Sequence, residues 1–466
     1  MSAPAIWIGL PLLVTLATLL MSNERLITIV GGLTAAGLGI TALLLPIDTP
    51  LLSGPLSFKV ASTLHILGRS LVLTDADGSM LAIFYGLAAL WFFGAETAGV
   101  ARRLVPLGLG MIALLVASIA VEPFLFAATF IEMAILLAIP MLSPPGQVPG
   151  RGVVRFLVYQ TLSLPFILFA GWMLVGVEAS PGDLALGLQS ATLLGMGFAF
   201  LLAVFPLYAW IPLLAEEASP FVLGFLLWVL PTITIVLGMG FLDHYAWLRT
   251  SPAMSGALQG AGTLMVVTGG VWTAFQRHLG RMMGYAAVVE TGFVVMALGI
   301  QPAWSALDVA FLHLIPRGVG LAVWALSLVL ISRKTGSLHF RAVRGMMRIY
   351  PLASAGVLLA HLSTAGFPLL AGFPPRLALW EGLAGQSLGL ALWLLLGVVG
   401  LMIGALRTLA ILAVTPEDPG WAWNETWVEG LLLAVGIAAL FILGLFPQLA
   451  RPFLAGLPLM FTHLSQ

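Results

Sequence analysis

Fourteen apolar stretches follow one another along this chain, and each is close to the roughly 20 residues that a helix needs to cross a lipid bilayer. Only 8% of the residues are charged, whereas 60% are hydrophobic. Soluble domains carry about one-quarter charged residues, so the pattern predicts an all-α integral membrane protein. The expected membrane helices cover residues 5–21, 26–46, 79–98, 104–120, 123–141, 153–177, 187–212, 220–242, 254–275, 282–300, 305–332, 350–374, 385–414 and 427–448.

The connections between these stretches are short, with one main exception. That connection spans 47–78, contains Lys59, Arg69, Asp75 and Asp77, and is expected to be an exposed loop. The N-terminal stretch lacks a positively charged start and a convincing cleavage site. We therefore expect it to be the first membrane helix rather than a removed signal peptide.

Composition also argues against several kinds of site. The chain has no Cys, which excludes disulfides, iron–sulfur clusters and thiolate metal sites. The glycine fingerprint of dinucleotide-binding folds is absent, and no basic run indicates a nucleic-acid partner. We therefore predict no cofactor, no metal site and no nucleic-acid binding.

The placement of Lys and Arg predicts the orientation of the chain, because these residues collect in cytoplasmic loops. Outside the predicted helix breaks, the connections that follow even-numbered helices carry only Lys59, Arg69, Arg249 and Arg451. The opposite connections carry Arg25, Arg102, Arg103, Arg151, Arg155, Arg277, Arg281, Arg333, Lys334, Arg341, Arg344 and Arg348. We expect both termini on the non-cytoplasmic side of a bacterial or archaeal inner membrane.

Two of the apolar stretches contain similar proline pairs. Residues 205–212 are Phe-Pro-Leu-Tyr-Ala-Trp-Ile-Pro, and residues 367–374 are Phe-Pro-Leu-Leu-Ala-Gly-Phe-Pro. A proline inside a helix removes a backbone donor and clashes with the carbonyl four residues earlier. We therefore expect helix breaks at Pro206 and Pro212 and again at Pro368 and Pro374. Paired broken helices in two halves of a membrane protein indicate a transport site.

Five ionisable residues inside or beside these stretches are candidates for a proton path. Glu132 and Glu290 lie near the middle of their helices, and His313 and Arg317 share one helix face. Arg376 directly follows the second break. A charge at mid-membrane costs about 2.5–3.5 kcal/mol, so each requires an explanation. For Glu132, the structural alternative is a neutral side chain bonded to a neighbouring helix.

Four further residues are weaker candidates. Glu217 follows the first break, where a solvated position at the membrane rim explains it, and Glu381 lies one to two turns beyond the second break. His361 and Arg407 are single polar residues in apolar helices. For these two, a packing hydrogen bond or a side chain that extends to the interface is the favoured explanation.

Several short motifs resemble, in order, the antiporter-like subunits of respiratory complex I, a family shared with Mrp cation/proton antiporters and membrane-bound hydrogenases. Glu132 falls where the family has its helix-five glutamate. Residues 205–212, followed by Glu217 and Ala218, resemble Phe-Pro-Leu-His-x-Trp-Leu-Pro with its Glu-Ala. His313 and Arg317 resemble the family's His-x-x-x-Lys, and residues 154–160, 281–285 and 366–376 resemble further family motifs.

The resemblance covers nearly the whole chain and implies its organisation. It implies helices 1–3 in residues 1–100, a first five-helix repeat (helices 4–8) in 101–242, an inverted second repeat (helices 9–13) in 254–414, and helix 14 in 427–466. Helices 7 and 12 would be discontinuous. It also implies a polar path along the membrane midplane that relays protons in step with other membrane subunits of a larger complex.

The chain departs from the family where the proton relay normally uses lysine. The helix-seven position is Leu201, and the helix-eight position falls near Thr232. A buried lysine can lose its proton, whereas arginine stays protonated in proteins. Arg317 and Arg376 can therefore hold a carboxylate but cannot serve as stations for a proton. The usual helix-ten histidine is replaced by Glu290.

Three functions remain open at this point. The first is a proton-translocating subunit of a complex I-like or Mrp-like membrane complex, with a path through carboxylates, histidine and water. The alternative is a non-pumping structural subunit that kept the fold as a docking scaffold and lost the relay lysines. A stand-alone transporter is the third, although no feature of the sequence specifies its substrate. The chain is not expected to be a catalyst alone, but it could belong to an NADH:quinone oxidoreductase-type translocase.

Overall fold

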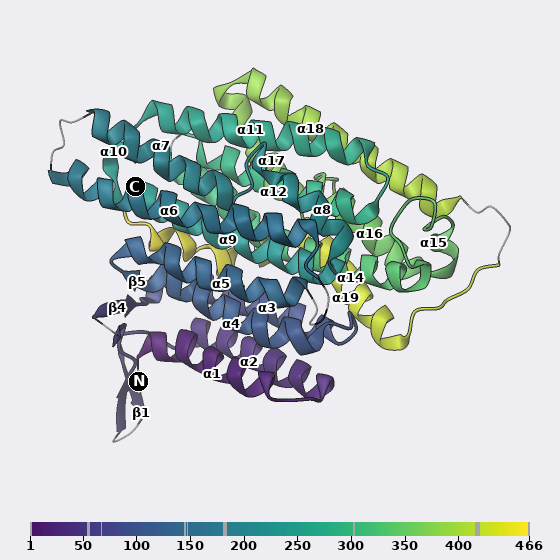
Figure 1. Ribbon diagram of the computed structural model, residues 1–466, viewed down its shortest axis with the longest axis horizontal. Coiled ribbons are helices and arrows are strands. Elements are labelled where there is room, and N and C mark those ends of the chain that lie inside the picture. Colours follow the sequence, from purple (N-terminus) through teal and green to yellow (C-terminus); the bar gives the residue numbers. More distant parts are fainter. Residues whose placement is uncertain are drawn as a thin grey trace.

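The computed structural model describes residues 2–53, 56–66, 68–143, 146, 148–179, 184–301, 303–414 and 420–464. Within these residues, ten helices are long and apolar enough to cross a membrane, and three shorter apolar helices accompany them. The helices lie side by side in one bundle, and both termini lie at the same end of it (Figure 1). The prediction of an all-α integral membrane protein is confirmed.

Most helices of the bundle begin and end within a few residues of the predicted stretches. They are α1 (Leu10–Leu19), α2 (Glu24–Leu44), α3 (Gly78–Ala95), α4 (Ala101–Ala120), α5 (Ala127–Leu142), α6 (Arg151–Ala179), α7 (Leu184–Leu201), α8 (Trp210–Glu217), α9 (Pro220–His244), α11 (Pro252–Phe275), α12 (Leu279–Leu298), α13 (Ala303–Leu312), α14 (Leu314–Thr335), α16 (Pro351–Thr364), α17 (Phe373–Gln386), α18 (Leu388–Ala413) and α19 (Trp427–Leu445). Single helical turns form α10 (Ala246–Arg249), α15 (Met346–Ile349) and α20 (Arg451–Leu454).

The connection 47–78 differs from the predicted loop, because it folds into antiparallel strands. One hairpin joins β1 (Pro50–Ser53) to β2 (Leu56–Lys59). A three-stranded sheet joins β3 (Thr63–Ile66), β4 (Arg69–Val72) and the two-residue β5 (Val121–Glu122). These strands lie at the same end of the bundle as the termini (Figure 1). Strands of two to four residues carry too little periodicity to predict, and β5 comes from a distant part of the chain.

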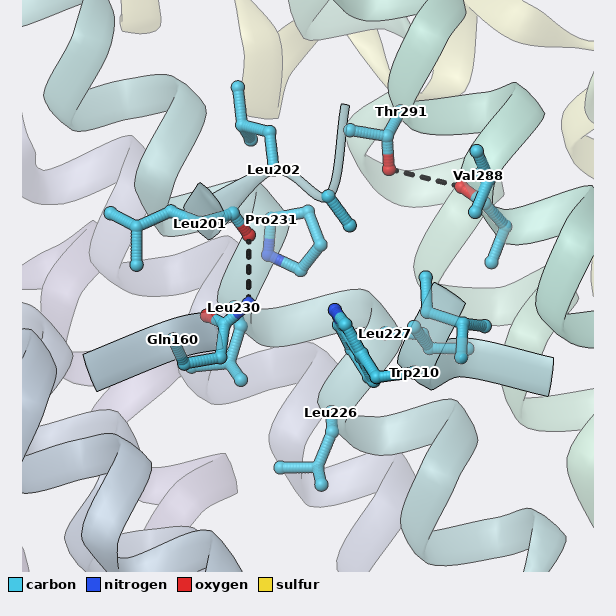
Figure 2. Close-up of a pocket in the computed structure, with 13 residues that line it drawn as sticks. Gln160, Leu201, Leu202, Trp210, Leu226, Leu227, Leu230, Pro231, Val288 and Thr291 are labelled. Atoms are coloured by element: carbon cyan, nitrogen blue, oxygen red, sulfur yellow. Dashed lines mark hydrogen bonds between the residues drawn. The ribbon is translucent and has the colours of Figure 1, made fainter. Parts of the chain in front are cut away.

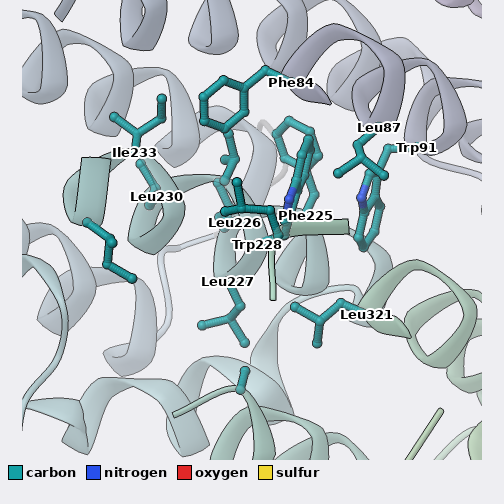
Figure 3. Packing of buried hydrophobic residues seen from close by; sticks show 14 of the residues in the cluster. Phe84, Leu87, Trp91, Phe225, Leu226, Leu227, Trp228, Leu230, Ile233 and Leu321 are labelled. Carbon is teal, nitrogen blue, oxygen red and sulfur yellow. The ribbon is translucent and has the colours of Figure 1, made fainter. Parts of the chain in front are cut away.

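Aromatic side chains pack the N-terminal helices against the centre of the bundle. Trp91 of α3 stacks on Trp228 of α9 with ring centroids 6.3 Å apart, and it contacts Phe225 edge-on at 5.8 Å (Figure 3). On α14, a Cβ at Gly318 would lie 2.7 Å from a methyl carbon of Leu87. In a bilayer, helices associate through such close packing rather than through the hydrophobic effect. Helix α9 also packs against α12 and α14, so it lies at the centre of the bundle.

Both proline-containing stretches leave the helical conformation. The first break lies between α7 and α8, with a 3₁₀ turn at Leu207–Ala209, and Ala203 has a φ of 54°. The second lies between α16 and α17, where Gly366 and Leu369 have φ values of 78° and 74°. Helix α17 runs on to Gln386, well beyond the predicted end at 374. The prediction ended too early because the charged residues of α17 interrupt the apolar pattern.

Candidate polar site within the membrane

The second break is closed by the side chain of Arg376. This residue lies in the first turn of α17 and is buried. Its Nε and Nη2 donate to the carbonyl of Thr364 at 3.2 and 2.8 Å. Thr364 is the last residue of α16, where carbonyls have no partner within the helix. The guanidinium therefore supplies the hydrogen bonds that the break removes, and its Cζ also lies 3.1 Å from the ring centroid of Phe293.

The backbone around the break leaves room for this guanidinium. Gly366 has a left-handed φ of 78°, and a Cβ there would lie 2.5 Å from Cγ of Arg376. Only glycine accepts both conditions without strain. Further along, the amide of Gly372 donates to Oγ of Ser363 at 3.0 Å. The loop is thus shaped by two glycines and one hydroxyl, and it presents Arg376 to the interior.

Arg376 connects two other predicted residues in one cluster. Its Nη1 lies 2.6 Å from Nε2 of His313, and Nη2 lies 3.8 Å from Oε1 of Glu290. Nδ1 of His313 lies 3.0 Å from the carbonyl of Val309, which can only accept. Nδ1 therefore carries the ring hydrogen, and Nε2 accepts from the guanidinium. The arrangement holds a neutral imidazole and a carboxylate on the same buried cation.

Arg317 lies one turn beyond His313 and bonds a carbonyl that a proline leaves free inside another helix, α9. Pro231 lies inside α9, and its ring removes the N–H that would bond the carbonyl of Leu227. Nη2 of Arg317 donates to that carbonyl at 2.7 Å and to Oγ1 of Thr291 at 2.8 Å. Its Nε and Nη1 are buried with no hydrogen-bond partner among the described residues. Arg317 therefore joins α9, α12 and α14 and keeps unused donors in the interior.

Two small cavities border these groups. One of about 10 Å³ is lined by Arg317, His313 and Thr232, and one of about 20 Å³ lies beside the first break. The second cavity is lined by Gln160, Leu201, Trp210 and Thr291 among others (Figure 2). A cavity of about 10–15 Å³ holds one water molecule. Thr291 borders the cavity of about 20 Å³ and bonds Arg317, which lines the smaller cavity together with His313.

The first break is closed by a neutral residue, Gln160, which is not among the site residues predicted from the sequence. Nε2 of Gln160 on α6 donates to the carbonyls of Phe200 and Leu201 at 3.2 and 3.4 Å, at the end of α7 (Figure 2). Its Oε1 is buried with no partner among the residues described. Gln160 is the single amide in the apolar stretch 153–177, and that isolation was the available signal.

Glu132 lies near the first break but outside the charged cluster. Its Oε1 accepts from Oγ1 of Thr161 at 2.7 Å, and its Oε2 is buried without a hydrogen-bond partner in the described part of the chain. Thr161 is the neighbour of Gln160 on α6. No ion pair within the described ranges joins Glu132 to a cation. Glu132 is thus bonded to a hydroxyl of the neighbouring helix α6 and to no cation among the described residues.

The four weaker candidates lie apart from the cluster. Glu217 is exposed and accepts from the amide of Gly152 at 2.7 Å, which caps the start of α6. His361 is fully buried, stacks on Trp324 with centroids 4.6 Å apart, and lies near the carbonyl of Leu401. Glu381 is exposed on α17. Arg407 is half-buried and donates to the carbonyl of Ala274 in the last turn of α11.

Comparisons with known proteins identify the family of the chain. Residues 156–404, more than half of the chain, match the family model described as NADH:quinone oxidoreductase/Mrp antiporter, transmembrane. The chain belongs to this NADH:quinone oxidoreductase/Mrp antiporter family. The matched region contains both breaks and the Glu290–Arg376 cluster, whereas Glu132 precedes it.

Relatives of this antiporter family cover much of the chain. This chain is 30% identical over 285 residues to NADH-quinone oxidoreductase subunit N of Cereibacter sphaeroides. The alignment covers 59% of this chain and 60% of that protein. The chain is 27% identical over 405 residues to subunit 14 of the Thermus thermophilus enzyme, covering 82% and 86%. The fold matches a chain of the Mrp complex from Dietzia with a TM-score of 0.80, 15% identity, and 99% and 97% coverage.

Proposed function

We propose that this chain is a proton-translocating, antiporter-like subunit of a multi-subunit membrane complex of the complex I or Mrp kind. The observation that carries the proposal is the buried cluster of Glu290, His313 and Arg376 beside the second break. Two water-sized cavities and the Arg317–Thr291 bond extend it toward the first break. The names of the relatives, NADH-quinone oxidoreductase subunits and an Mrp complex, support a partner-coupled role.

In this proposal the residues of the cluster have different tasks. Glu290 and His313 are the groups that can gain or lose a proton, because arginine does not deprotonate in proteins. Arg376 and Arg317 hold the positive field that makes a nearby carboxylate stable inside the membrane. Proton arrival at His313 would weaken its hydrogen bond with Arg376, since both partners would then be donors. Arg376 would then be free to move toward Glu290, which would couple the protonation of His313 to that of Glu290.

The proposal includes the organisation that the family resemblance implies. We propose fourteen membrane crossings, with inverted repeats in residues 101–242 and 254–414 between an N-terminal unit (1–100) and helix 14 (427–466). The two broken helices, each in one of these units, support this division. We also propose that both termini face the non-cytoplasmic side of a bacterial or archaeal inner membrane, in keeping with the arginine distribution.

The test is Glu290→Gln in the purified parent complex, reconstituted in liposomes that report proton flux with a pH-sensitive dye. The amide keeps the size of the side chain but cannot carry a proton, so we expect flux to fall about tenfold or more. Glu381→Gln, which changes an exposed carboxylate on α17, is the matched control and should leave flux unchanged. Full flux in an intact Glu290→Gln complex would contradict the proposal.

A non-pumping docking subunit is the second candidate, and the first break favours it. Leu201 fills the position of the expected lysine and only its backbone carbonyl takes part in a polar contact. Thr232 donates to the carbonyl of Trp228 in its own helix. If neither Glu290→Gln nor Glu132→Gln alters the proton stoichiometry of an assembled complex, this second function is the correct one.

A further inference from the structure

Three potential metal ligands meet at the surface, outside the polar cluster. Glu216 comes from the end of α8, His278 directly precedes α12, and His339 lies in the segment after α14. The ligand atoms of all three lie within 4.8 Å of one another. Glu216 and His339 are exposed, so a cation in water can reach them, whereas His278 is buried. The sequence predicts no metal site, because the chain has no Cys and these three residues lie far apart along it.

Backbone hydrogen bonds hold the two histidines opposite each other. The amide of Leu279 donates to the carbonyl of Leu338 at 3.0 Å, and the amide of Phe340 donates to that of Arg277 at 2.9 Å. These bonds flank His278 and His339, which form an isolated antiparallel bridge. Side chains of such a pair lie on one face and close together. The two imidazole rings are accordingly 4.8 Å apart, in an edge-to-face arrangement.

The donor set suits a borderline transition metal. Two imidazoles and one carboxylate, with a fourth position open to water, are a common ligand set for Zn²⁺. Hard cations such as Mg²⁺ prefer oxygen ligands and should not bind here.

We propose that Glu216, His278 and His339 form a binding site for a zinc-class transition metal. Such an ion would tie α8, the second half of the first broken helix, to the start of α12 and to the segment after α14. The site does not depend on whether protons cross the protein, so its test is separate from that of the proposed function. An ion bound there would restrain the broken helix at its exposed end.

Two interactions in the structure already occupy ligands of the proposed ion and would compete with it. Nδ1 of His278 accepts from the amide of Arg281 at 3.2 Å, and Nη2 of Arg281 pairs with Oε2 of Glu216 at 2.7 Å. Removing the charge of Arg281 frees the carboxylate and removes a repulsive cation. Arg281→Gln should therefore raise the affinity for Zn²⁺, whereas loss of a ligand should lower it.

The experiment is calorimetric titration of ZnCl₂ into the untagged full-length chain in mild detergent, after treatment with a chelator. We expect one strong site, weakened about tenfold or more by His339→Ala, because one of three ligands is lost. His278→Asn removes a ligand while asparagine preserves the helix cap. His65→Ala, which removes an exposed histidine of β3, is the control and should bind as the unaltered chain does.

Thermal unfolding provides the second measurement. A ligand that binds only the folded state raises its stability, so Zn²⁺ should raise the unfolding midpoint of the unaltered chain and of His65→Ala. The same concentration should have little effect on His339→Ala, and MgCl₂ should have little effect on any of them. Zinc binding that is absent, or equally tight in His339→Ala and the unaltered chain, would overturn the proposal.

Discussion

The two broken helices face the same backbone problem and solve it with different side chains. At the first break, the neutral amide of Gln160, from a neighbouring helix, bonds the carbonyls at the end of α7. At the second, the cation of Arg376, from the resumed helix itself, bonds the carbonyl that ends α16. A permanent charge requires a counterion when it is buried, and Glu290 lies beside it. The second break therefore contains a buried ion pair, whereas an uncharged amide stabilises the first.

The largest effect on stability is expected from Arg376→Ala. It leaves Glu290 as an unpaired buried carboxylate and removes both bonds to the Thr364 carbonyl. Breaking one side of a buried ion pair costs about 3–5 kcal/mol of unfolding free energy. Chemical unfolding in detergent measures this loss, with Glu381→Ala on the same helix as the control. If the two variants lose equal stability, Arg376 does not support the second break.

A smaller loss is expected from Gln160→Leu at the neutral break. The change leaves the Phe200 and Leu201 carbonyls without this donor, and an unsatisfied buried polar group costs about 1–3 kcal/mol. Gln189→Leu, at an exposed position of α7, is the matched control. The same unfolding measurement applies. A loss as large as that of Arg376→Ala would remove the difference between the two breaks.

The smallest of these effects is expected from Thr291→Val, which tests the contact between the two small cavities. The variant removes one bond of Arg317, which keeps its bond to the Leu227 carbonyl, and side-chain volume is kept. It should also slow proton flux, because the hydroxyl borders the cavity of about 20 Å³ beside the first break. Thr234→Val loses only a bond within α9 and borders neither of the two small cavities, so it is the control. Equal flux in both variants would show that Thr291 does not take part in the proton path.

The sequence predicted those features that depend on local pattern. Apolar length identified the membrane helices, and the prolines at 206 and 368 located regions where the chain is not helical. The strands around Lys59 were missed, since short strands depend on partners elsewhere in the chain. The end of α17 was missed because Arg376 and Glu381 interrupt the apolar pattern although the helix continues.

The residues of the candidate site could be predicted from the sequence, but their hydrogen-bond and ion-pair partners could not. Residue type and depth singled out Glu290, His313 and Arg376. Nothing in the sequence showed that Arg376 would bond the end of α16, or that Arg317 would bond the carbonyl exposed by Pro231. Such pairings depend on helix rotation and packing. Glu132 satisfied the same sequence criteria as Glu290, yet the structure gives it a threonine partner instead of a cation.

The difference between Glu290 and Glu132 gives the most direct test of the central claim, that the second break carries the proton path. Proton flux should be measured in reconstituted complexes carrying Glu290→Gln or Glu132→Gln, with assembly checked in each. We predict that Glu290→Gln lowers flux about tenfold or more and that Glu132→Gln has a much smaller effect. A complex that loses its flux with Glu132→Gln and keeps it with Glu290→Gln would contradict the claim.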